Sequence, residues 1–244
     1  MNKHLRSLLS ACGFCMLLIT ACTKTDIIAP PEISQSRMLE YKIVNVQGDP
    51  IIGTINDADS SITVYLPFYL QLVILEPEIK VSGGATVTPA SGTLVEDLID
   101  VFQNGRDIKY IVTGKDGSKK TYTLNIEVQQ PPVVLEELST ADNIRNYNVR
   151  TSTLSLRITL KGSGFSENRD LMRMEMVDDA GNVYPLAIAL NNFNDTKTLN
   201  INLSKNPQGL AIFDSFETSK TFRIRVYSYA RQATTQYPIQ ITKT

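Results

Sequence analysis

Residues 154–162 read LSLRITLKG, and apolar and polar side chains alternate along the run. Leu154, Leu156, Ile158 and Leu160 share one face of a strand, because successive side chains point to opposite faces. The same period of two recurs at residues 62–66, 108–112, 122–128, 172–176, 184–190 and 199–203. Only residues 94–102, LVEDLIDVF, suit a short helix, and a loop suits them equally. Short strands at regular spacing, with turns between them, predict an all-β fold built of sandwiches.

The chain has 244 residues, enough for one or two domains with proper cores. Gln129-Gln130-Pro131-Pro132 interrupts the strand pattern and separates residues 38–130 from residues 131–244. Each part has the length of one sandwich domain. Residues 22–37 lack periodicity and contain Pro30-Pro31, which is typical of a tether.

Residues 1–21 combine a basic start, Lys3 and Arg6, with a short apolar run that is too short to span a bilayer. This pattern is typical of an export signal. The run ends in Ile19-Thr20-Ala21-Cys22, which resembles the bacterial lipoprotein signal, where a cysteine is lipidated and becomes the new N-terminus. The resemblance implies a membrane anchor at Cys22 and, with Thr23 after it, the bacterial outer membrane. A plain signal peptide with a chance cysteine is the alternative.

Composition narrows the classes of function. The chain carries 24 basic and 25 acidic residues, so it lacks the basic surplus that nucleic-acid binding needs. The single histidine is His4, and the cysteines are Cys12, Cys15 and Cys22. A chain that begins at Cys22 has no imidazole for a catalytic triad and no ligand set for structural zinc. We therefore expect no enzymatic activity, while carboxylate chemistry and oxygen-ligated calcium stay open.

The first block resembles the immunoglobulin-like repeats of Bacteroidetes surface lipoproteins over roughly residues 40–128. The motifs that carry this resemblance are Ile52–Ile55, Val64–Pro67, Gly83–Pro89 and Tyr110–Gly117. The second block, through Ile158–Phe165, is similar to transcription-factor-like immunoglobulin domains of bacterial surface proteins. The resemblance implies two immunoglobulin-like β-sandwich domains in tandem. It further implies a role in adhesion or as an accessory of a glycan-uptake locus, without catalytic residues to transfer.

Two groups of carboxylates are candidate sites. Asp57 and Asp59 lie between two strand patterns, where calcium could bind oxygen ligands, although Asn and Asp are also common turn residues. Glu96-Asp97 and Glu136-Glu137 could supply a glycosidase pair, but neighbouring residues of a strand point to opposite faces. We expect a turn to account for the first group and no catalysis from the second.

Residues 222–231, FRIRVYSYAR, carry the strongest candidate for ligand binding. One of the two alternating sets of positions holds apolar residues that suit a core. The other set holds Arg223, Arg225, Tyr227, Tyr229 and Arg231. If no bulge intervenes, these five residues form one exposed strip, and arginine and tyrosine are enriched where proteins bind partners. The alternative is a solvated outer face that binds nothing.

These patterns together predict a lipid-anchored surface protein that binds without catalysis. Its expected partners are the membrane, through the lipid, and either a glycan or a host or matrix protein. The alternative is a structural spacer or an assembly subunit that holds other surface proteins, as in a surface complex or fimbria.

Overall fold

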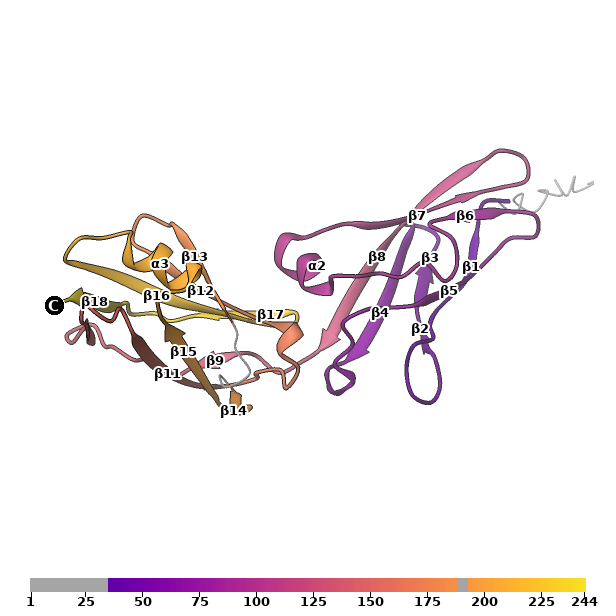
Figure 1. Cartoon of the computed structure of the whole chain (residues 1–244). Helices are drawn as coiled ribbons and strands as arrows, with labels where there is room; N and C mark the ends of the chain where they lie inside the picture. The colour runs from indigo at the N-terminus through magenta and orange to yellow at the C-terminus, as the bar shows by residue number, and fades with distance from the viewer. Residues whose placement is uncertain (1–34, 188–192) are drawn as a thin grey trace, which may run out of the picture. The chain divides into compact units, whose positions relative to one another are not determined.

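A computed structural model describes residues 35–187 and 193–244 of the chain (Figure 1). The described residues form one compact unit that contains two hydrophobic cores. The expected signal segment, Cys22 and most of the expected tether lie outside the described residues, as do Ile188 and Leu190. Among the described residues, no helix is long and apolar enough to cross a membrane.

Strands dominate both halves of the described chain, which confirms the all-β prediction. In the first half the elements are β1 (Met38–Ile43), β2 (Ile51–Ile52), β3 (Thr54–Asn56), β4 (Ser61–Pro67), η1 (Phe68–Leu70), β5 (Pro77–Val81), β6 (Thr86–Thr88), α2 (Leu98–Asn104), β7 (Ile108–Thr113) and β8 (Lys119–Gln129). In the second half they are β9 (Val134–Leu135), β10 (Asn146–Val149), β11 (Leu156–Ser163), η2 (Arg169–Leu171), β12 (Met172–Asp178), β13 (Val183–Leu186), β14 (Phe193–Asp195), β15 (Thr198–Leu203), α3 (Pro207–Phe213), β16 (Ser219–Ser228), β17 (Arg231–Thr234) and β18 (Ile239–Lys243).

Two sheets with strand orders β2-β1-β5 and β3-β4-β8-β7-β6 enclose the first core. Strand β4 runs parallel to β8, while β7 and β8 form an antiparallel hairpin. Inside, the rings of Tyr41 and Tyr110 meet edge to face at 5.5 Å, and their hydroxyl groups lie 3.1 Å apart. This contact satisfies two buried phenols within an otherwise apolar core.

Two further sheets enclose the second core, with strand orders β10-β18-β16-β12-β13 and β14-β15-β11-β9. The core-facing residues follow the predicted alternation. They include Ile158, Leu160, Met172, Met174, Met176, Leu199, Ile201, Leu203, Phe222, Ile224 and Val226. The period of two thus selects the correct face on β11, β12, β15 and β16.

Helix α2 is the one helix that the sequence suggests in the first half. Asp97 caps it, because its carboxylate accepts the N–H of Asp100 at 3.1 Å, and Gly105 ends it in the left-handed region at φ 66°. Leu98 and Ile99 face the first core. The helix carries Phe102 and Gln103 toward the residue that completes this core.

That residue is Tyr229, which comes from the second half of the chain yet packs in the first core. It is 1% exposed, and its ring meets Phe102 edge to face at 5.3 Å. Its hydroxyl donates to the carbonyl oxygen of Leu72 at 2.9 Å. The Gln130 side chain holds the residues on either side of Tyr229 by two hydrogen bonds. It donates one to Ser228 O at 2.8 Å and accepts one from Ala230 N at 3.2 Å. That residues 38–130 and 131–244 fold independently stays a prediction.

Asp178 organises the turn between β12 and β13. Its carboxylate accepts hydrogen bonds from the backbone of Ala180 and Asn182 at 3.0 and 2.8 Å, and Lys220 Nζ lies 2.7 Å away. Burial alone would raise the pKa of Asp178, but Lys220 and Asn182 outweigh it and hold that pKa well below its ordinary value. The ionised carboxylate therefore stabilises the folded protein at neutral pH, and this contribution is lost as the pH falls through the depressed pKa.

We predict that Asp178→Asn lowers the free energy of unfolding by about 1.5–3 kcal/mol at neutral pH, the range for hydrogen bonds to charged groups. Asp179→Asn is the matched control, because Asp179 pairs with Arg223 at 3.5 Å but its side chain is 64% exposed. Urea unfolding should show a change within about 0.5 kcal/mol for that control. The deficit of Asp178→Asn should shrink as the pH drops below about 4, and a deficit that is independent of pH would contradict the charge argument.

Candidate functional site

The first three residues of the expected strip, on β16, are half-buried on the outer face of the sheet, and the two cations among them pair with carboxylates. Arg225 Nη1 lies 3.4 Å from Glu175 Oε2 on the neighbouring strand β12, and Arg223 Nη1 lies 3.5 Å from Asp179 Oδ1. Arg225 also donates to the hydroxyl oxygen of Tyr227 at 3.4 Å. Such cross-strand pairs are typical of a solvated sheet face.

The strip does not continue through Tyr229 as one exposed face. Strand β16 ends at Ser228, and residues 229 and 230 form the turn to β17, with Tyr229 at φ 51°. This left-handed residue breaks the alternation and directs the ring into the first core, so the expectation that Tyr229 is solvent-facing is wrong. Arg231 then begins β17, opposite Ser228.

Three of the five strip residues nevertheless meet around one small pocket of about 110 Å³. Tyr227, Tyr229 and Arg231 line it together with Phe102 and Gln103 of α2. The side-chain nitrogen of Gln103 is buried there without a hydrogen-bond partner within the described ranges. The pocket has room for a few water molecules or one small polar group and is too small for a sugar ring with its hydroxyls.

The two aspartates that suggested calcium are engaged otherwise. Asp57 accepts a hydrogen bond from the Tyr122 hydroxyl. It also forms ion pairs with Arg37 at 2.7 Å and with Lys120 at 3.1 Å. Burial would raise the pKa of Asp57, but these hydrogen bonds outweigh it and lower that pKa. Asp59 accepts hydrogen bonds from the side chains of Asn56 and Ser61 within its own turn. With two cations on Asp57, the geometry favours a turn over calcium.

The carboxylate doublets also have structural partners. Asp97 caps α2, and Glu137 accepts the backbone N–H groups of Gln236 at 2.8 Å and Tyr237 at 3.2 Å. Across residues 35–187 and 193–244, no group of three or more acidic, histidine or cysteine side chains could hold a metal ion.

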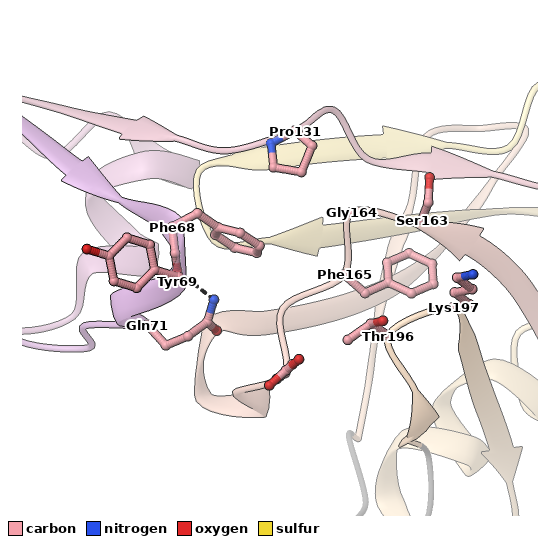
Figure 2. Close-up of a pocket in the computed structure, with 10 residues that line it drawn as sticks. Phe68, Tyr69, Gln71, Pro131, Ser163, Gly164, Phe165, Thr196 and Lys197 are labelled. Carbon is pink, nitrogen blue, oxygen red and sulfur yellow. Dashed lines mark hydrogen bonds between the residues drawn. The ribbon is translucent and has the colours of Figure 1, made fainter.

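A larger crevice of about 390 Å³ opens beside η1, and sequence reasoning missed it. Phe68, Tyr69 and Gln71 form one wall, and residues from the segment after β11 form the other, including Phe165 and Glu167. Figure 2 shows the rings of Phe68 and Phe165 on opposite sides of the crevice, with Tyr69 at its edge. Tyr69 is 79% exposed, so an aromatic ring is available to a ligand.

Gln71 links the two walls of this crevice. Its side-chain nitrogen donates to Phe68 O at 2.8 Å, the dashed line in Figure 2. Its side-chain oxygen accepts from Asn168 N at 3.3 Å and from the Ser166 hydroxyl. A preformed crevice with an exposed ring and polar groups beside it suits a sugar, whose apolar face stacks on aromatic rings while its hydroxyls need donors and acceptors.

Comparison with protein families gives one match. Residues 42–126 match the family described as "SGBP, N-terminal", and this range lies inside residues 40–128, where the sequence resembles the repeats of Bacteroidetes surface lipoproteins. The match covers most of the first core and none of the second. No curated protein matches the chain.

Solved structures give weaker likenesses. A Bacteroides thetaiotaomicron protein described as a "putative glycoside hydrolase" is 23% identical, with a TM-score of 0.32, over 48% of this chain and 33% of that one. A protein of unknown function from the same organism is 17% identical, with a TM-score of 0.31, over 46% and 22%. Murine CEACAM1b is 9% identical, with a TM-score of 0.24, over 87% and 89%. The chain thus spans a third or less of the two Bacteroides proteins.

We predict that Tyr229→Ala destabilises the protein by roughly 3–5 kcal/mol, because it empties an aromatic site in the first core and removes the hydrogen bond to Leu72. Tyr227→Ala is the matched control from the same strip, and its half-exposed ring should contribute less than about 0.5 kcal/mol. Thermal melting measures both variants. Equal melting temperatures would show that Tyr229 does not complete the core.

Proposed function

We propose that this chain is a non-catalytic glycan-binding protein of the bacterial cell surface. The observation that carries the proposal is the match of residues 42–126 to the SGBP family, whose members are glycan-binding surface proteins of Bacteroidetes. The crevice beside η1 supports it, since it offers an exposed tyrosine with amide, carboxylate and hydroxyl groups nearby. Either glycan capture for uptake or adhesion to a glycan-bearing host or matrix protein would use such a crevice.

Absence of catalysis is part of this proposal and rests on the residues available. The only histidine is His4, inside the expected signal segment. Asp97 and Glu137, one carboxylate from each sequence doublet, accept backbone hydrogen bonds instead of facing a partner carboxylate. Glycoside hydrolysis needs two carboxyl groups on either side of the bond that is cleaved.

We also propose attachment to the outer membrane through lipid on Cys22. Cys22→Ala should move the protein from the membrane fraction to the soluble fraction, because no acylated cysteine then anchors it. Cys15→Ala is the matched control, since Cys15 lies inside the apolar run of the same signal and should leave the anchor intact. If Cys22→Ala stays with membranes after an alkaline wash, the anchor lies elsewhere.

A spacer or assembly subunit is a second candidate function. The insertion of Tyr229 into the first core, together with the Gln130 bridge, favours it, because both tie the two halves of residues 34–244 into one unit. A subunit that holds another surface protein needs this kind of fixed scaffold. It would retain that protein and no glycan.

A glycan array of the purified chain tests the main proposal. We expect retention of at least one glycan, and Tyr69→Ala should weaken it about tenfold, because an exposed stacking ring is lost. Tyr65→Ala is the matched control, as it removes a tyrosine that is 48% exposed on β4 outside the crevice. Unchanged retention of Tyr69→Ala would move the site away from η1. No retained glycan at all would favour the spacer.

A further inference from the structure

A second groove, of about 370 Å³, lies on the second half of the chain and shares no lining residue with the crevice beside η1. Arg157, Thr159 and Lys161 line it from β11, at alternate positions of the strand. Alternate positions share one face, so both cations face the groove, roughly 13 Å apart along the strand. Arg145 adds a third cation beside β10. We call this the basic groove, defined by Arg145, Arg157 and Lys161.

The cations of the basic groove differ from those on strand β16 of the same half. Arg223, Arg225 and Lys220 each lie within 4 Å of a carboxylate. In the part of the chain that the structure describes, Arg145, Arg157 and Lys161 have no ion pair. Three cations that form no ion pair raise the local positive potential, and this favours an anionic ligand.

Two carboxylates, Glu136 and Glu137, also line the groove, and Glu137 already accepts hydrogen bonds from the backbone. Both oxygens of Glu137 accept backbone N–H groups, from Gln236 and Tyr237. Glu136 is the other, and it is exposed. The ionised side chains that line the groove therefore sum to a positive charge, with Glu136 left as an acceptor.

Other groups of the groove suit sugar hydroxyls and a sugar ring. The Thr159 hydroxyl donates to Asn200 Oδ1 at 3.0 Å, so toward a ligand its oxygen can only accept. Tyr147 presents a half-exposed ring, with the Arg145 guanidinium 5.2 Å from its centre. Burial raises the pKa of Tyr147 more than Arg145 lowers it, so the phenol stays protonated and can donate. A simple inorganic anion would use none of these acceptors or the ring.

We propose that the basic groove binds an acidic oligosaccharide, whose carboxylate or sulfate groups pair with Arg145, Arg157 and Lys161 while its hydroxyls meet Thr159 and Glu136. This inference rests on the proposed glycan-binding function and names the class of glycan. It assigns a second binding surface, distinct in its residues from the crevice beside η1. Because the attraction is between charges near the surface, binding weakens as salt concentration rises.

The test measures binding of the full chain, purified in detergent, to three probes by affinity gel electrophoresis. Oligogalacturonate carries carboxylates, dextran sulfate carries sulfates and dextran carries neither. Arg157→Gln with Lys161→Gln should weaken binding of the acidic probe roughly tenfold or more, since two charge-assisted contacts are lost. Lys115→Gln with Lys119→Gln is the matched control, because it removes the same charge from the exposed hairpin between β7 and β8. All four side chains are exposed or nearly so, and melting curves should coincide.

Each outcome decides the proposal. Salt-sensitive binding of oligogalacturonate or of dextran sulfate, lost only in the Arg157/Lys161 variant, supports the groove and identifies carboxylate or sulfate as the group bound. Binding of dextran alone, or equal weakening in the two double variants, overturns the groove and leaves the proposed function standing. If neither these probes nor any glycan on the array is retained, both proposals fail together.

Discussion

Burial of Tyr229 in the first core is the contact on which the rest of the described structure depends. The ring enters from a turn of the second half, at a left-handed backbone position that costs about 1–2 kcal/mol for a residue with a side chain. That strain is offset by burial of the ring against Phe102 and by the hydrogen bond to Leu72. The first core is therefore complete only when this turn of the second half packs against it. The two sequence blocks are connected by packing as well as by the chain.

The charged side chains of β16 and β11 differ in whether a carboxylate pairs with them. On β16, each arginine that faces outward meets a carboxylate, so this sheet face is neutral and solvated. On β11, the cations face a groove instead and meet no such partner in the residues that the structure describes. The same residue types, spaced two apart on strands of the same half, thus have different electrostatic surroundings. Residue type alone did not distinguish a groove lined by unpaired cations from a neutral sheet face.

Strand alternation was readable from the sequence because its period is set by backbone geometry and not by neighbours. It identified the core-facing residues on β4, β8, β11, β12 and β16. It failed at Tyr229, because the strand ends one residue earlier and a turn has no period of two. It could not find the crevice, since Phe68 and Phe165 lie far apart in the chain. An aromatic pair directly after Pro67, at the end of a strand, was the one local signal there.

The contacts between the two halves of the chain also bear on the shape of the crevice beside η1. Gln71 lies just after η1 at φ 49°, and its side chain is hydrogen-bonded on both walls of the crevice, to Phe68 on one and to Asn168 on the other. A wall held in this way loses little conformational freedom when a ligand enters, and that loss is a main cost of association. The contacts that hold the two halves together therefore also keep the crevice open in the free protein. In the proposed glycan-binding role, weakening the contacts of Tyr229 would therefore raise the cost of binding, although Tyr229 does not line the crevice.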